Sequence, residues 1–245
     1  INAGLNVLCH GAQSYFPYTS DPEAAEQIEA MAKARGVTFT GGGIWDMSRI
    51  WAGLLVAGPC THMKSLFHSS ITDAQVQAAT PAQAMQMGCG MSVEEFYKKG
   101  MDKSPLPGVY ITIPQHVLAA LGLTLTQTRT RIEPVTVDVP VETTLMGTLP
   151  SGHCLGSRII VDVDTKEGVS AHSEIDVRFF RPGEVEHMFW SVDGMPRSSV
   201  RAERQDSDYA TAACLFNRIP DVIAAAPGIM PVSKLGPLKP TAFMV

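Results

Sequence analysis

The chain has 245 residues, of which 45% are hydrophobic and 18% charged, with a formal net charge of -5. This composition is typical of a globular protein with a sizeable core, and the acidic balance, without a basic run interleaved with aromatics, argues against nucleic-acid binding. No apolar run reaches the roughly 18 residues of a membrane span. Five scattered cysteines without C-x-x-C spacing indicate reduced thiols. We therefore expect a cytoplasmic protein without metal, nucleic-acid or membrane partners.

The first forty residues predict two parallel strands joined by a helix. Residues 6–9 form a short apolar strand, and Asp21 with Pro22 is a well-formed helix start. Gly36 ends that helix, and the β-branched and aromatic run 37–40 follows. Because the chain opens at Ile1 in the middle of this α/β unit, we expect further sequence ahead of it.

A glycine turn, Gly41 to Gly43, joins the second strand to a helical pattern that Gly58 ends. Glycines allow close approach of a bound molecule, and the turn places Trp45 and Asp46 at the carboxyl end of a strand, where open α/β sheets bind ligands. The alternative is that Asp46 only caps the helix and Trp45 is core. The polar loop after the first strand, His10 to Tyr15, is a second candidate edge of the site.

The chain after residue 59 predicts a strand over 61–70, short helices from Thr80 and Ser92, a loop at 105–108 and a helix from Pro114 to Gly122. Strands separated by turn signals, including Asp193-Gly194, follow at 132–141, 155–163, 173–180, 185–192 and 198–203. In the third of these, Ile175, Val177 and Phe179 alternate with Glu174, Asp176 and Arg178, which indicates an antiparallel sheet with one wet face.

A last helix is predicted from Asp208 to Ile219, ending before Pro220, with a proline-rich tail on the surface. The fold class is therefore α/β with an α+β second part. The C-terminal half of a Rossmann-type nucleotide domain (1–58) precedes a mostly antiparallel sheet domain with helices on one face (59–205). The helix and tail (206–245) return to the nucleotide domain.

Several motifs in this order resemble the dihydrodipicolinate-reductase-like oxidoreductases, in particular 2,4-diaminopentanoate dehydrogenases and native amine dehydrogenases. They extend over nearly the whole chain: Ala3 to Leu8 with Phe16-Pro17, Lys33 to Val37, Asp46, Glu133-Pro134, Phe189 to Pro196, Asn217 to Pro220 and Ala225 to Ile229. The resemblance implies NAD or NADP as cofactor and hydride transfer to or from a carbon bearing an amine, imine or carbonyl in a small substrate.

The chain departs from that family in two places. It contains no Gly-x-Gly-x-x-Gly turn, so the resemblance implies that roughly 100 residues with the phosphate-binding unit precede Ile1. The family's proton-transferring glutamate is matched here by Ala12 and Gln13, and a glutamine is no general base at neutral pH. An alcohol, ketone or cyclic imine substrate is therefore as plausible as an amine.

The candidate catalytic residues are His10, which titrates near neutral pH, Gln13 and Asp46. The candidate substrate contacts are the aromatic residues Tyr15, Trp45 and Trp190, each of which could instead be core. Beyond His10, the candidate cofactor contacts are Cys9 and Gly11 at the strand end and Asn217, which the matching family motif places near the cofactor.

A different function is also open. Without a phosphate-binding turn, the chain could be a catalytically silent binding or dimerisation module. In either case an open sheet needs cover, so we expect a homodimer through the second domain.

Overall fold

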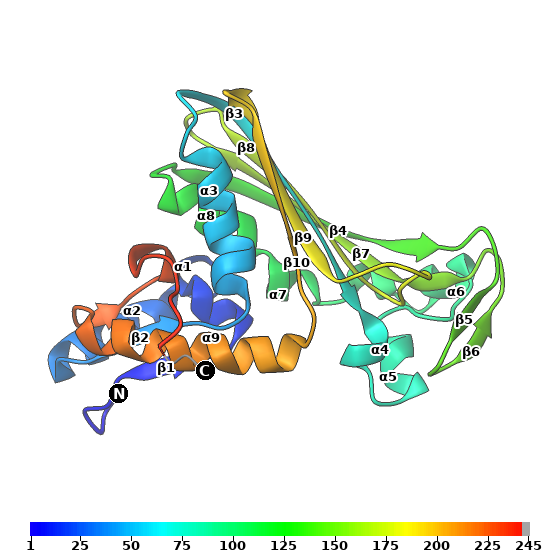
Figure 1. Ribbon diagram of the computed structural model, residues 1–245, viewed down its shortest axis with the longest axis horizontal. Coiled ribbons are helices and arrows are strands. Elements are labelled where there is room, and N and C mark those ends of the chain that lie inside the picture. The colour runs from blue at the N-terminus through cyan, green and yellow to red at the C-terminus, as the bar shows by residue number, and fades with distance from the viewer. Residues whose placement is uncertain (242–245) are drawn as a thin grey trace.

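A computed structural model describes residues 1–241 and contains two sheets (Figure 1). The smaller sheet has the order β1-β2-β11, formed by Val7–Cys9, Thr38–Gly41 and Gly228–Ile229, and all its pairings are parallel. Helix α2 (Pro22–Arg35) joins β1 to β2, as the sequence predicts. The Asp21 carboxylate accepts a bond from the Ala24 amide at 3.0 Å, and Gly36 ends the helix in the left-handed conformation.

The larger sheet has six strands in the order β10-β9-β3-β8-β7-β4, and only the β3–β8 pair is parallel. The mixed, mostly antiparallel sheet predicted for the second part of the chain is confirmed. Its strands are β3 (His62–Asp73), β4 (Leu125–Thr136), β7 (Cys154–Thr165), β8 (Ser170–Arg178), β9 (His187–Met195) and β10 (Ser198–Glu203).

Helices cover one face of the larger sheet and bury its main core. The π-helix η2 (Asp46–Trp51) and α3 (Ala52–Ala57) run on from the glycine turn, and α8 (Thr112–Ala120) packs beside them (Figure 1). Trp190 and Ile159 on the sheet and Val117 on α8 are fully buried in this core. Short helices α1 (Pro17–Ser20) and α7 (Pro107–Tyr110) and the 3-10 helices η1 (Ala12–Tyr15) and η3 (Met101–Lys103) complete the layer.

A second core lies at the far end of the larger sheet. Helices α4 (Ala74–Gln77), α5 (Pro81–Gln86) and α6 (Val93–Lys98) gather there with the hairpin β5 (Val141–Thr143) and β6 (Gly147–Leu149) (Figure 1). Leu155, Phe179 and Cys89 are fully buried in it. Ser92 and Glu95 form the capping box expected at the start of α6.

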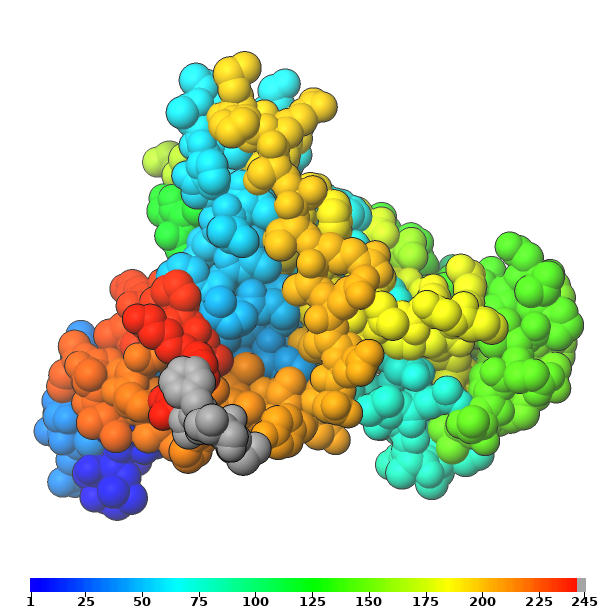
Figure 2. All heavy atoms as spheres, viewed as in Figure 1, coloured from blue at the N-terminus to red at the C-terminus, as the bar shows by residue number. Residues whose placement is uncertain are grey.

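Helix α9 (Ser207–Ala224) returns to the smaller sheet, but it does not end before Pro220 as predicted. Pro220 lies inside the helix, on its exposed side. Proline has no backbone N–H, so the carbonyl one turn earlier can bond water instead. The tail then adds β11, which the sequence did not predict. Its remainder, including η4 (Val232–Lys234), lies over η2, where the Trp51 indole donates to the Val232 carbonyl at 3.2 Å (red in Figure 2).

Other boundaries also differ from the prediction. Strand β4 begins at Leu125 and ends at Thr136, seven residues earlier than expected at its start, and α7 occupies part of the predicted loop. Gly194, predicted in a turn, lies within strand β9. A Cβ at this position would lie 2.4 Å from the His62 carbonyl oxygen of β3, so only glycine fits here. This glycine therefore serves a close approach within the sheet.

The predicted wet face of β8 is only partly wet. Asp176 and Arg178 are buried, because they pair with each other at 3.2 Å and with Arg158 and Glu184 on neighbouring segments. No helix within residues 1–241 is both long and apolar enough to cross a membrane, and no cluster of three metal-ligating side chains occurs among these residues.

Candidate functional site

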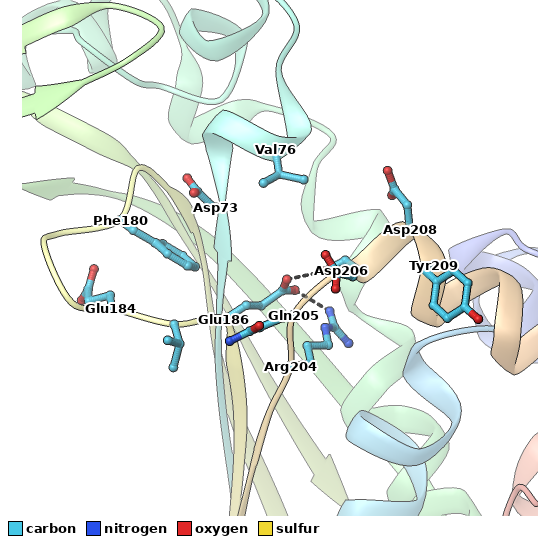
Figure 3. A pocket seen from close by; sticks show the side chains of 12 residues that line it. Asp73, Val76, Phe180, Glu184, Glu186, Arg204, Gln205, Asp206, Asp208 and Tyr209 are labelled. Atoms are coloured by element: carbon cyan, nitrogen blue, oxygen red, sulfur yellow. Dashed lines mark hydrogen bonds and ion pairs between the residues drawn. The ribbon is translucent and has the colours of Figure 1, made fainter. Parts of the chain in front are cut away.

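A cavity of about 310 Å³ lies where the carboxyl ends of β1 and β2 face the larger sheet. We call it the inner cavity. Its walls come from segments far apart in the sequence, with His10 and Tyr15 on one side and Arg49 and Tyr110 on another. A wider cavity of about 720 Å³, the outer cavity, shares Glu186 and the start of α9 with it (Figure 3). A cavity between strand ends and a second layer is the usual ligand site of an α/β protein.

The glycine turn builds one wall of the inner cavity by packing against the loop after β1. A Cβ on Gly41 would lie 2.3 Å from the Ser14 backbone, and one on Gly43 would lie 2.8 Å from the His10 ring. The expectation that these glycines admit a ligand is therefore wrong, because the space is taken by the chain itself. The Gly42 amide donates to the Cys9 carbonyl at 3.0 Å and locks the two strand ends together.

Three aromatic rings line the inner cavity. Tyr15 and Trp45 lie 5.4 Å apart, and Trp45 stacks on Tyr110 at 5.7 Å between ring centroids. The Tyr15 hydroxyl is buried and has no hydrogen-bond partner within residues 1–241. Burial, with the neighbouring Asp46 charge, raises the pKa of Tyr15 well above its usual value, so the hydroxyl keeps its proton.

Asp46 lies behind this wall, not in it. Both Asp46 and Arg218 are fully buried, and their side chains pair at 3.0 Å from carboxylate oxygen to Nε. The carboxylate also accepts from the Gly43 amide at 3.2 Å, which fixes the glycine turn. Burial raises the pKa of Asp46 to about 6, against the lowering effect of Arg218. Asp46 is not the helix cap weighed as an alternative, since Trp45 holds that position.

Arg49 follows on η2, is 1% exposed and lines the inner cavity. Its guanidinium carbon lies 4.7 Å from the Trp45 ring and 5.5 Å from the Tyr110 ring. Its Nε and Nη1 atoms are buried without a hydrogen-bond partner in the described chain. Burial lowers the pKa of Arg49 to about 10, which still leaves it charged at neutral pH.

A further ion pair lies at the boundary between the two cavities and lines both of them. Glu186 pairs with Arg204 at 2.5 Å and accepts a bond from the Ser207 hydroxyl at the start of α9 (Figure 3). Arg49, Glu186 and Arg204 are not among the site residues predicted from the sequence. Only the helical position of Arg49 on an otherwise apolar face could have indicated it, since a buried arginine there needs a partner.

The remaining sequence candidates lie apart from one another. Gln13 is exposed and does not line the inner cavity, whereas its neighbour Ala12 does. Trp190 is fully buried against His68 in the main core and lines neither cavity. Asn217 accepts bonds from the amide and hydroxyl of Thr241 and so holds the tail.

Comparison with known proteins places this site in context. No family model matches the chain. The chain is 25% identical to the 2,4-diaminopentanoate dehydrogenase of Acetoanaerobium sticklandii over 239 residues, which covers 92% of this chain and 65% of that protein. The amine dehydrogenase structure from Mycobacterium smegmatis has a TM-score of 0.77 and 26% identity, and the match covers 97% of this chain and 70% of the other. The predicted family resemblance is confirmed.

This chain therefore spans slightly less than two thirds of the length of its curated relative. Both proteins are dehydrogenases by name.

Proposed function

We propose that the chain is the substrate-binding part of an NAD(P)-dependent oxidoreductase that moves hydride to or from a carbon bearing an amine, imine or carbonyl. The observation that carries the proposal is the inner cavity. It lies at the carboxyl ends of two parallel strands, and aromatic rings form a wall against which a small substrate would pack. The likeness to two dehydrogenases supports the same reaction class.

The residues of the chain fit the nicotinamide end of such a cofactor, which supplies the hydride when bound. The His10 loop and the aromatic wall offer a surface at the strand ends. The glycines of the turn do not fit a pyrophosphate, since Ser14 and His10 occupy the space beside Gly41 and Gly43. No phosphate contact is therefore assigned to the turn.

The proton in this reaction passes through Tyr15. Its hydroxyl is buried, protonated and unpaired in the described chain, so it can donate to the oxygen or nitrogen of the substrate. Asp46, held by Arg218 behind the aromatic wall, keeps this hydroxyl protonated through its charge, and the exposed His10 lies at the edge of the same cavity. This arrangement takes the place of the family's glutamate, which Ala12 and Gln13 do not supply.

The test is a fluorescence titration of NADH and NADPH into this chain and into a form that also carries a complete phosphate-binding unit ahead of Ile1. We expect tight binding to the extended form only, followed by turnover of a ketone or imine that Tyr15→Phe reduces about a hundredfold or more. Failure of both forms to bind either cofactor would refute the proposal.

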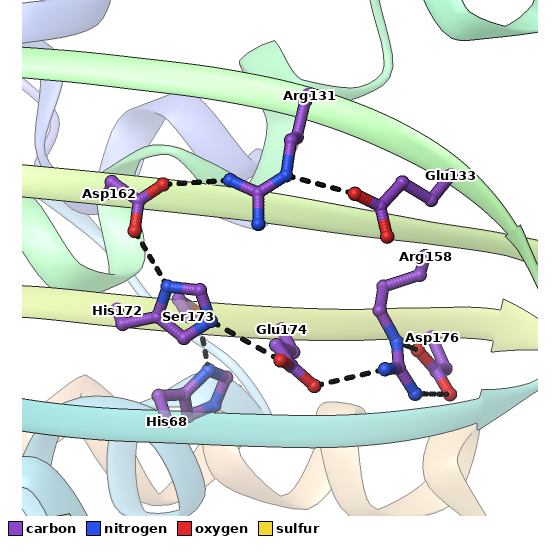
Figure 4. Close-up of polar contacts among 9 residues, drawn as sticks. All are labelled: His68, Arg131, Glu133, Arg158, Asp162, His172, Ser173, Glu174 and Asp176. Atoms are coloured by element: carbon purple, nitrogen blue, oxygen red, sulfur yellow. Dashed lines mark hydrogen bonds and ion pairs between the residues drawn. The ribbon is translucent and has the colours of Figure 1, made fainter.

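We further propose that the protein is a homodimer through the outer face of the larger sheet. No helix of residues 1–241 covers this face, which carries Phe67 and Phe189 beside a ladder of ion pairs across β4, β7 and β8 (Figure 4). The two His172 nitrogens, for example, face Asp162 at 2.6 Å and Glu174 at 3.2 Å. A face that combines half-buried aromatic rings with fixed charges suits a twofold contact. Light scattering should return twice the 26.3 kDa chain mass.

The five cysteines are scattered along the chain, which is typical of a reducing compartment, and we include a cytoplasmic location in the proposal. Fractionation of cells that express the natural protein tests this location directly.

A further inference from the structure

The outer cavity gathers apolar side chains that the fold leaves uncovered. Val76 on α4 and Tyr209 in the first turn of α9 line it with exposed fractions of 65% and 72% (Figure 3). Phe180 and Val185, from the segment between β8 and β9, complete its apolar walls. Apolar side chains from three segments, brought together in one concave site and still exposed, are typical of a binding surface.

The outer cavity continues the inner cavity. Glu186, Arg204, Ser207 and Asp208 line both of them. A molecule whose reacting carbon lies in the inner cavity, as in the function proposed above, therefore has about 720 Å³ of further space beyond this boundary, more than the 310 Å³ of the inner cavity itself. Together the two cavities have room for a ligand considerably longer than its reacting group.

The charges of the outer cavity restrict what this remote end can be. Of the five carboxylates in its lining, Glu184 and Glu186 each pair with an arginine, at 2.6 Å and 2.5 Å. The other three, Asp73, Asp206 and Asp208, form no ion pair within residues 1–241, and the single arginine of the lining is the one that Glu186 already holds. An uncompensated negative potential of this kind repels anions and admits neutral groups.

We propose that the outer cavity binds the remote end of the substrate, and that this end is an apolar alkyl or aryl group without a carboxylate. The position of the reacting end rests on the proposed function, whereas the binding of an apolar group between Val76 and Tyr209 does not. The substrate class is then a ketone, imine or amine whose chain is long enough to pass the boundary formed by Glu186 and Arg204. Its affinity should rise with chain length, because each further methylene leaves water for these walls.

The experiment is a ligand-observed NMR titration of the chain with three amides, which mimic the carbonyl substrate but are not reduced. They are butanamide, octanamide, and suberamate, which is octanamide with a carboxylate in place of its terminal methyl group. We expect octanamide to bind about tenfold or more tightly than butanamide, because its longer chain reaches the apolar walls. We expect suberamate to bind about tenfold or more weakly than octanamide, because its carboxylate loses water beside uncompensated acids.

Two sets of variants locate the binding. Val76→Asp should remove most of the chain-length preference, whereas Val139→Asp, at a valine that is also 65% exposed but lines neither cavity, should leave it unchanged. Asp206→Asn combined with Asp208→Asn should narrow the difference between octanamide and suberamate severalfold. Asparagine suits the left-handed backbone at Asp206, where φ is 52°, so this variant keeps the turn.

Equal affinities for octanamide and butanamide would overturn the inference, as would a chain-length preference that survives in Val76→Asp. Suberamate that binds as tightly as octanamide, or a difference that the double asparagine variant does not change, would overturn the exclusion of carboxylates by these acids. An extended chain that binds NADH but shows no chain-length preference contradicts this inference alone. A preference for octanamide without cofactor binding by the extended chain supports the apolar site and contradicts the proposed oxidoreductase.

Discussion

Removing the guanidinium of Arg49 should stabilise the free protein, whereas removing that of Arg218 should destabilise it. Both arginines are buried, with exposed fractions of 1% and 0%, so the two substitutions to methionine remove a similar side chain from a similar depth. They differ in pairing. Arg49 has no ion pair within residues 1–241, and Arg218 holds Asp46 at 3.0 Å.

The magnitudes follow from this difference. Replacing a buried ion pair by apolar side chains of similar volume is neutral or stabilises a protein by about 1–4 kcal/mol, and an unpaired buried charge has no pairing energy to lose. Loss of the contacts with Trp45 and Tyr110 offsets about 1 kcal/mol of the gain. Arg49→Met should therefore gain about 1 kcal/mol, or about 2–4 °C in Tm for a chain of this size. Arg218→Met leaves the Asp46 carboxylate buried and unpaired, which costs about 3–5 kcal/mol.

The assay is urea denaturation at pH 8, where Asp46, with a pKa of about 6, is ionised. A loss of more than about 1 kcal/mol in Arg49→Met without ligand would refute the reasoning, since the guanidinium would then contribute to the fold through its packing alone.

Three further predictions test the wall of the cavity, the pH response and the sheet face. Gly41→Ala should lower the unfolding free energy by about 2 kcal/mol or more in urea denaturation, since its Cβ would lie 2.3 Å from the Ser14 backbone, whereas Gly108→Ala, with open space around it, should not. Burial lowers the pKa of His116 to about 3, below its unfolded value of about 6.5. The unfolded chain therefore binds more protons below pH 6.5, so stability should fall as the pH drops below 6.5, by up to about 1.4 kcal/mol per pH unit for this residue. His116→Asn should remove this contribution and leave that of His68, whose pKa burial also lowers. Phe67→Arg on the outer face should halve the mass in light scattering, and an unchanged dimer would reject this face as the interface.

The sequence predicted the parts of the fold that local chemistry determines. The cap at Asp21 and the left-handed Gly36 fix α2 within the chain's own backbone, and both are found. Alternation indicated that β8 lies in an antiparallel sheet, and it pairs antiparallel with β7, although its other neighbour, β3, is parallel to it. The prediction was wrong where a distant segment decides, as at Gly194, where the approach of β3 and not a turn requires glycine.

The site shows the same limit. The sequence located its edges, His10 to Tyr15 and Trp45, because strand ends can be read from local patterns. It missed Glu186 and Arg204, since only the return of the chain through β10 into α9 brings them to the cavity. It also assigned Trp190 to the substrate, although the structure places this ring in the core against His68, on the helix-covered face of the sheet.

The charges around the cavity are divided in a way that favours binding over stability. Asp46 with Arg218 and Glu186 with Arg204 each form a compensated pair, so both pairs can stay buried without a ligand. Arg49 is the exception among the buried arginines of this region, and it lies between the rings that would contact a substrate. An unpaired buried charge that served only the fold would be replaced without loss by a methionine or leucine. The unpaired Arg49 in the wall of the inner cavity therefore points away from a purely structural role.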